Sequence, residues 1–496
     1  MTIKREPTLF ESFIPVIFLI LLLTINVGIF GDEALGGSNQ IVLILSAAVA
    51  AIIAIRLGYR WSQLQDGIVR SIGSAMSSML ILLLIGSLAG TWMLSGVVPA
   101  MIYYGLQILS PRIFLFAACI VASIVSLATG SSWTTSATVG IALIGIGRAL
   151  GIYDGLIAGA ILSGAYFGDK MSPLSDTTNL APAMAGTDLF THIRYMAYTT
   201  IPSITISLII FLIIGFTQDL TLVSTNTANI LTAISDRYYI SGILFIVPVV
   251  VIIMIVRKVP AIPALLAGTL LGSLFALLFQ PHLVLEVSQQ SAYNGKLFDF
   301  FYSNFPVFTQ MFMGTIQSLF GDISITTDNA MVTGLLSAGG MKGMLGTIWL
   351  ILSAMIFGGV MEKAGFLKRI AKTIISFVNS TGSLVGSTVG TCVFFNITAS
   401  DQYLAIVVPG RMYSEIYKEK GLAPQNLSRS LEDSGTVTSV LIPWNTCGAY
   451  HASVLGVSTL VYAPFAFFNI ISPFMSIFYA YAGIRIKKLV SKEEEN

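Results

Sequence analysis

The chain has 496 residues, of which 55% are hydrophobic and only 10% are charged, and its mean hydropathy is +0.84. A soluble globule of this size needs far more polar residues to cover its surface, so the composition excludes that class and indicates an integral membrane protein. The net charge of +2, without a basic cluster interleaved with aromatic residues, argues against a nucleic-acid-binding protein.

Long apolar stretches predict membrane-spanning helices, because about 20 apolar residues are needed to cross roughly 30 Å of hydrocarbon as a helix. A β-barrel would instead show alternating apolar and polar residues, so we expect an all-α polytopic membrane protein. The apolar stretch after Lys4 and Arg5 lacks a convincing cleavage site and is expected to remain as the first helix. The expected crossings, five in each half of the chain, are 12–31, 40–57, 72–95, 152–187 and 192–216, followed by 238–256, 259–279, 345–362, 428–455 and 461–484.

Between the third and fourth crossings of each half lie a short amphipathic stretch and a longer segment with polar residues near its middle. The longer segment is expected to form a re-entrant helical hairpin, whose tip points into the protein because non-helical backbone at membrane depth needs protein or a water-filled cavity around it. The fourth crossing of each half is expected to be a broken helix. The first repeat is predicted over 1–216, with an amphipathic stretch at 97–110, a hairpin at 112–150 and a broken helix at 152–187, and an external linker follows at 217–237. The second repeat is predicted over 238–484, with an external loop at 280–344, an amphipathic stretch at 366–378, a hairpin at 381–420 and a broken helix at 428–455. A cytoplasmic tail is predicted over 485–496.

The distribution of Lys and Arg predicts the orientation, because short cytoplasmic loops carry an excess of positive charge. With both termini in the cytoplasm, most of the 26 basic residues fall on the cytoplasmic side. An odd number of crossings per half then makes the second repeat run inverted relative to the first. Residues 95–99, where the first amphipathic stretch begins, carry no charge, whereas their counterpart in the second half, residues 364–369, is flanked by Lys363 and Lys372, which fits the inversion. Inverted repeats are typical of alternating-access carriers, here expected in the inner (plasma) membrane.

Two polar motifs interrupt the apolar sequence, and each occurs once in each half, about 270 residues apart. Such paired interruptions in corresponding positions of two hydrophobic halves are typical of the substrate site of a secondary transporter. Each copy therefore resembles half of a binding site. The copies are Thr129-Gly130-Ser131-Ser132 with Thr398-Ala399-Ser400-Asp401, and Pro173, Ser175 and Asp176 with Pro443, Asn445 and Thr446.

The broken helices carry the chemistry expected of a cation site. Gly168 and Pro173 weaken the first helix and free carbonyl groups, while Asp169 and Asp176 supply negative charge. Residues 432–448 repeat this pattern in the second half. Hard oxygen ligands of this kind suit Na⁺, and an anionic ligand could instead use the amides at the hairpin tips.

Each of these residues also has a purely structural interpretation. An ionisable residue at bilayer depth costs at least about 2.5 kcal/mol, which favours function, but Asp169 could simply be neutralised by its neighbour Lys170. The Ser and Thr hydroxyls could donate to carbonyls of the preceding turn. His451 is a candidate proton relay, and Trp133 and Trp444 either wall a cavity or pack in the core.

The combination of motifs closely resembles the NhaC family of Na⁺/H⁺ antiporters over nearly the whole chain. That family is similar in plan to the wider ion transporter superfamily. The resemblance implies paired re-entrant hairpins, broken helices, a transport domain that moves against a scaffold, and a homodimer. The motifs that carry it are Gly130-Ser131-Ser132-Trp133-Thr134-Thr135, Gly168-Asp169-Lys170-Met171-Ser172-Pro173-Leu174-Ser175-Asp176-Thr177-Thr178, Glu432-Asp433-Ser434-Gly435 and Pro443-Trp444-Asn445-Thr446-Cys447-Gly448.

The resemblance also implies the residues of the site. The repeats differ at one important position. When the two four-residue motifs are aligned, Asp401 stands in the place of Ser132, so the two half-sites need not bind the same ligand. Na⁺ is expected near Asp176, Ser132, Asp401 and Thr398. The first half-site would contain Thr129, Ser131, Ser132, Thr134, Asp169, Ser172, Asp176 and Thr177, and the second Asn396, Thr398, Ser400, Asp401, Asp433, Asn445 and Thr446.

The function that the resemblance implies is exchange of Na⁺ for H⁺ by alternating access. Family members also exchange organic acids such as malate and lactate together with Na⁺ and H⁺, and amino acids are a further alternative. An organic anion would need a cationic partner in the cavity, for which Lys170 is the basic residue within the motifs. Two inverted half-sites fit a carrier better than a channel. The sequence has no Gly-x-Ser-x-Gly element and no His-rich or Cys-rich spacing, so we expect no enzyme, no catalytic residue and no cofactor besides the transported ions.

Overall fold

The computed structural model describes residues 5–30, 34, 36–217, 223–290, 296–328, 330–376 and 378–489. Within these ranges the chain is almost entirely helical. The β-structure there is limited to an isolated bridge and to β1 (Ile323–Ser324), which pairs antiparallel with β2 (Ser337–Ala338). The expectation of an all-α protein is confirmed.

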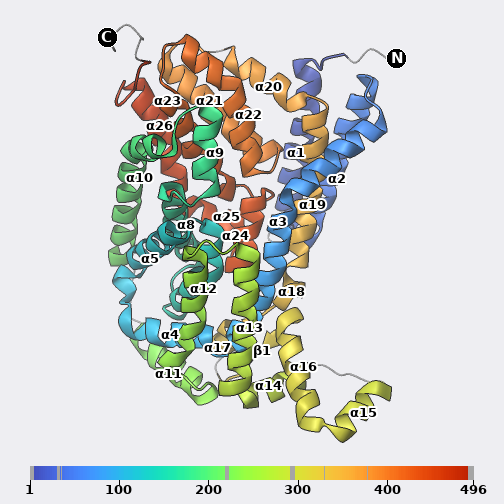
Figure 1. Cartoon of the computed structure of the whole chain (residues 1–496), viewed down its shortest axis with the longest axis vertical. Helices are drawn as coiled ribbons and strands as arrows, with labels where there is room; N and C mark the ends of the chain where they lie inside the picture. Colours follow the sequence, from blue (N-terminus) through green and yellow to red (C-terminus); the bar gives the residue numbers. More distant parts are fainter. Residues whose placement is uncertain are drawn as a thin grey trace.

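The helices follow one another with short connections (Figure 1). In chain order they are α1 (Leu9–Phe30), α2 (Ser38–Arg56), α3 (Trp61–Leu94), α4 (Val97–Ile108), η2 (Pro111–Ile113), α5 (Phe114–Thr129), α6 (Ser132–Thr135), η3 (Ser136–Gly140), α7 (Ile141–Ala149), α8 (Asp154–Met171), α9 (Asp176–Ala185), α10 (Leu189–Thr217), α11 (Val223–Arg237), η4 (Gly242–Phe245), α12 (Ile246–Val256), α13 (Ala261–Phe279), α14 (Pro281–Ser288), α15 (Lys296–Asn304), α16 (Pro306–Phe320), α17 (Ala330–Leu335), α18 (Gly340–Gly343), α19 (Leu345–Lys363), α20 (Phe366–Ile375), α21 (Thr381–Thr398), α22 (Gln402–Glu419), α23 (Pro424–Leu431), η5 (Glu432–Thr436), η6 (Ser439–Leu441), α24 (Thr446–Leu455), α25 (Thr459–Tyr462), η7 (Ala463–Phe465) and α26 (Phe467–Tyr481).

Most of the expected crossings appear as helices of the required length. Within the described residues, seven helical stretches are long and apolar enough to cross a membrane, and two bent pairs raise the number to nine if each pair is one span. The expected crossings 152–187 and 428–455 are not among them, because each is interrupted by non-helical residues. One stretch, Pro111–Thr129, was expected as the first arm of a hairpin, yet it is long enough to span by itself.

The two amphipathic stretches lie at opposite ends of the molecule. Figure 1 shows α4 near one end and α20 near the other, while the start of α1 and the end of α26 lie at the same end as α20. This placement agrees with the inversion expected from the charges. The exact division into two inverted repeats stays a prediction.

Close packing of small residues places α8 at the centre of the protein. A Cβ atom on Gly164 would lie 2.1 Å from the carbonyl oxygen of Cys119, and one on Gly168 would lie 2.4 Å from that of Ser123. Only glycine allows α5 and α8 to approach so closely, as is common between helices in membranes. Nearly all of α8 is therefore buried, including Asp169 near its end.

A buried ion pair ties α8 to the second half of the chain. Lys170 on α8 and Asp433 on η5 form a salt bridge, and both side chains are completely buried. Thr199 on α10 donates to the carboxylate of Asp433 at 2.8 Å, and the ammonium of Lys170 donates to the hydroxyl of Ser472 on α26 at 3.0 Å. Four elements that are distant in sequence meet at this pair.

Breaking one partner of this pair should destabilise the fold strongly. We expect Lys170→Met or Asp433→Leu to cost about 3–5 kcal/mol each, because the remaining charge is left unpaired in the interior. The double variant should recover much of this loss. Thermal or denaturant unfolding in detergent measures the three effects.

The half-exposed pair Arg148–Asp154 provides the matched control, since its side chains are 33% and 39% exposed. Arg148→Met and Asp154→Leu should each change stability by no more than about 1 kcal/mol. Equal losses at the two pairs would contradict a structural role for the buried one.

Candidate functional site

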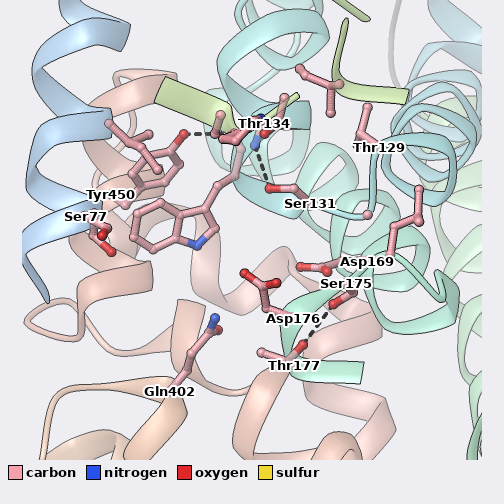
Figure 2. Close-up of a pocket in the computed structure, with 18 of the residues that line it drawn as sticks. Ser77, Thr129, Ser131, Thr134, Asp169, Ser175, Asp176, Thr177, Gln402 and Tyr450 are labelled. Carbon is pink, nitrogen blue, oxygen red and sulfur yellow. Dashed lines mark hydrogen bonds between the residues drawn. The ribbon is translucent and has the colours of Figure 1, made fainter. Parts of the chain in front are cut away.

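A cavity of about 760 Å³ lies where the interrupted helices meet. Hydroxyl, carboxyl, amide and aromatic side chains converge on it (Figure 2). Helices α3 and α13 also contribute to its lining. The lining residues are Ser74, Ser77, Ser78 and Ile81 of α3; Thr129, Gly130, Ser131, Trp133 and Thr134 of the first hairpin tip; Asp169, Pro173, Leu174, Ser175, Asp176 and Thr177 of the first broken helix; Ile255, Lys258, Val259, Pro260, Ala261 and Leu265 around the α12–α13 turn; and Gln402, Tyr403, Thr446 and Tyr450 of the second half.

Each interrupted helix begins with a polar side chain that caps it. A free backbone N–H inside an apolar protein is costly, so a helix that starts there needs an acceptor immediately before its first turn. The side chain of Ser131 accepts from the Thr134 N–H (3.1 Å), Ser175 from the Thr178 N–H (3.4 Å), Asp401 from the Leu404 N–H (3.0 Å) and Asn445 from the Cys447 N–H (3.0 Å).

The caps define which residues correspond between the two halves. Ser175 and Asn445 start α9 and α24, as the duplicated motif predicts. At the hairpin tips, Gly130 (φ 69°) and Ser400 (φ 60°) have the left-handed conformation, and the capping residue follows each directly. Asp401 therefore corresponds to Ser131, and the alignment with Ser132 is wrong by one position. The reason is that the second tip has one more residue between its two helices.

Asp169 is held by the first hairpin tip. The backbone N–H and the hydroxyl of Ser132 both donate to Oδ2 of Asp169, at 3.1 and 2.7 Å. Asp176, at the start of α9, is exposed to the cavity. Figure 2 shows the carboxyl groups of Asp169 and Asp176 facing each other. The cavity thus presents two acidic groups from one broken helix.

The positive charge near these acids is largely engaged elsewhere. Lys170 is paired with Asp433 and does not line the cavity, so the interpretation that Lys170 neutralises Asp169 is wrong. Among the described residues that line the cavity, Lys258 carries the positive charge. The cavity therefore favours ligands with positive charge.

The predicted site residues fall into two groups. Several second-half residues hold the backbone together: Asn396 donates to the Gly435 carbonyl (2.8 Å), and the hydroxyl of Thr398 donates back to the Phe394 carbonyl (2.7 Å). The residues that line the cavity are Thr129, Ser131, Thr134, Asp169, Asp176, Thr177 and Thr446; those that do not are Ser132, Ser172, Asn396, Thr398, Ser400, Asp401, Asp433 and Asn445.

Residues that were not predicted as ligands also belong to the cavity and its surroundings. The rings of Trp133 and Tyr450 stack at 3.8 Å and form an aromatic wall. The hydroxyl of Thr177, which lines the cavity, donates to the completely buried carboxyl group of Glu432 at 3.0 Å. In the sequence, the available indication of this role was that Glu432 directly precedes the predicted site residue Asp433 in the same motif.

His451 is buried, and its ring nitrogens have no hydrogen-bond partner in the described part of the chain, so it has no relay partner there.

The donor set fits an alkali cation. In the described ranges, no group of three or more His, Cys, Asp and Glu residues could hold a metal ion. The two carboxyl groups are instead surrounded by hydroxyls, among them those of Thr129, Ser131 and Ser175. Oxygen-only surroundings of this kind suit Na⁺ rather than a transition metal.

Known proteins resemble this chain over most of its length. Residues 164–484 match the model of the Na⁺/H⁺ antiporter family. The Na(+)/H(+) antiporter NhaC of Alkalihalophilus pseudofirmus is 36% identical over 449 residues, covering 90% of this chain and 91% of the relative. The malate-2H(+)/Na(+)-lactate antiporter of Bacillus subtilis is 37% identical over 480 residues, covering 97% and 96%. The arginine/ornithine antiporter ArcD of Halobacterium salinarum is 33% identical over 484 residues, covering 97% and 93%. The chain therefore belongs to the Na⁺/H⁺ antiporter family, as its motifs predict.

Proposed function

We propose that this protein is a secondary transporter that exchanges Na⁺ for H⁺ across the membrane. The observation that carries the proposal is the pair of carboxyl groups, Asp169 and Asp176, that face each other in a cavity among interrupted helices. The relatives that are Na⁺/H⁺ antiporters support the same exchange.

The geometry of the acids provides a simple basis for exchange. Two carboxylates that face each other in a partly dehydrated cavity repel, and the repulsion is relieved either by a bound cation or by a proton. In our proposal Na⁺ binds between Asp169 and Asp176 with help from nearby hydroxyls, and protonation releases it. Binding of one ion therefore displaces the other, which is the coupling that antiport requires.

The attachment of the first hairpin suggests which parts move together. Ser132 fixes the hairpin tip to Asp169, so the tip and the broken helix form one unit around the acids. We propose that this unit and its second-half counterpart move against α3 and α13, which also line the cavity. The dimer expected from the resemblance belongs to this proposal as well.

A second candidate function is exchange of an organic solute coupled to these ions. Its specific support is the cavity volume of about 760 Å³, because pockets of roughly 300–1,000 Å³ typically hold small organic ligands. With Asp169 and Asp176 opposed by Lys258, the charge favours a cationic amino acid over a dicarboxylate. The similarity to an arginine/ornithine antiporter agrees with that choice, whereas the similarity to a malate and lactate antiporter favours the anion.

Removing either cavity acid should abolish exchange. In liposomes that contain a pH-sensitive dye, we expect Asp169→Asn and Asp176→Asn each to slow Na⁺-driven proton flux at least about tenfold, equivalent to about 1.4 kcal/mol. The control is Glu415→Gln, at an exposed carboxyl on α22 that lies outside the cavity, and it should behave as the unmodified protein. Normal flux in both Asp variants would show that ions bind elsewhere.

The role of Asp401 can be separated from that of the cavity acids. Asn caps a helix about as well as Asp, so Asp401→Asn should keep both the fold and the Na⁺-driven flux. Asp401→Ala should instead lower stability by about 1 kcal/mol through loss of the cap. Loss of flux in a stably folded Asp401→Asn protein would place a transported ion at this carboxylate.

The two candidate functions differ in their requirement for an organic solute. We expect Na⁺ alone to trigger proton flux, and arginine or ornithine to change that flux more than malate or lactate, because the cavity acids attract cations. The measurement uses the same liposomes with each solute added outside. A flux that appears only with malate or lactate would reject both the simple exchange and the preference for cations.

A further inference from the structure

A second polar pocket lies outside the transport cavity, at the end of the molecule where α20 and the start of α1 are found (Figure 1). It has a volume of about 210 Å³ and lies between the N-terminal segment, the α2–α3 turn and α20. Four cations line it, namely Arg5, Lys368, Arg369 and Lys372, and the acid that faces them is Glu6. The pocket therefore carries a strong excess of positive charge.

Helix α20 has the form of a helix that lies at a membrane surface. Phe366, Leu367 and Ile370 are buried against the protein, whereas Lys368 and Lys372 are exposed. Because the apolar face packs on the protein, the lysines point away from it at this end of the molecule, where anionic headgroups attract basic residues. The aliphatic stems of such lysines can follow apolar surface while the ammonium groups reach the phosphates.

Arg369 supplies a donor that the described part of the protein does not use. Its side chain is half-buried, and its Nε is enclosed without a hydrogen-bond acceptor. An enclosed donor without an acceptor is costly. Arg5, by contrast, is paired with Glu11, and its backbone N–H donates to the Leu57 carbonyl, which fixes the N-terminal segment at the edge of the pocket. The N-terminal segment and α20 thus hold these cations close together, with Glu6 as the acid among the lining residues.

We propose that this pocket binds the phosphate group of an anionic phospholipid. The planar guanidinium of Arg369 matches phosphate oxygens geometrically, and Lys368 and Lys372 add charge at the rim. Basic pockets at the cytoplasmic surface of membrane proteins recognise anionic headgroups in this way. A lipid held here would connect α20 to the N-terminal segment, at a place separate from the two cavity acids.

The proposal can be tested by lipid retention. The full-length protein is solubilised with phosphatidylglycerol or phosphatidylcholine and examined by native mass spectrometry. We expect retained phosphatidylglycerol on the unmodified protein, and at least about tenfold less on Arg369→Gln/Lys372→Gln, because two of the pocket's cations are lost. Phosphatidylcholine retention should be low for both proteins.

The matched control is Lys418→Gln/Lys420→Gln, which removes two exposed cations of the α22 region outside the pocket. It should retain phosphatidylglycerol like the unmodified protein, and equal thermal stability of all three proteins excludes misfolding as the cause. Equal retention by the pocket variant, or equal loss in the control, would overturn the proposal. Inorganic phosphate that binds while phosphatidylglycerol does not would also overturn it, because the source of the phosphate would then be soluble.

Discussion

The structure depends on one constraint: a helix that starts inside an apolar protein must have its first backbone N–H groups capped. Four helices start in this way, and Ser131, Ser175, Asp401 and Asn445 cap them. The polar residues that interrupt the apolar sequence are therefore needed for folding, whatever else they do. Because the same interruptions bring helix ends together, they also create the cavity in which ions can bind. Two of the four capping residues, Ser131 and Ser175, also line the cavity.

The distribution of charge around the cavity follows from which groups are paired. Asp433 neutralises Lys170 in the interior, so Lys170 is engaged outside the cavity, and Lys258 is the cation among the described lining residues. Within the described residues, Asp169 receives two hydrogen bonds from Ser132 but no salt bridge, and Asp176 is exposed to the cavity. What remains is a site with net negative charge in a protein interior, and such a site is stabilised by a cation or a proton. The proposed exchange depends on this difference between the acids: Asp433 is paired with Lys170, whereas Asp169 and Asp176 are available to a cation or a proton.

Much of the architecture could be predicted from the sequence because hydrophobic length and helix-breaking residues act locally. The long apolar stretches become α1, α2, α3, α10, α13 and α19, and the breaks occur at the predicted motifs near Pro173 and Pro443. The hairpin tips lie at Gly130 and Ser400, within the predicted segments. Local patterns could not reveal how the second tip differs from the first. One added residue in the second turn makes Ser131, rather than Ser132, the counterpart of Asp401.

The contents of the site were less predictable, because they depend on contacts across the chain. The pairing of Lys170 with Asp433 joins residues 263 positions apart, so the sequence suggested the adjacent Asp169 as the partner instead. For the same reason the contact of Glu432 with Thr177, across 255 positions, was not predicted, although Glu432 lies in the motif that was expected to form the second broken helix. The motifs identified the right segments, but only the packing of α8 against the second half shows which side chains face the cavity.

The central claim is that Na⁺ and H⁺ compete for the two acids of the cavity. The most direct test is the release of protons when Na⁺ is added to the purified protein in weakly buffered detergent solution, followed with a pH indicator. The account predicts that Na⁺ binding releases protons and that Asp176→Asn loses this release while remaining folded. Na⁺ binding without proton release, or an undiminished release in the Asp176→Asn protein, would contradict it.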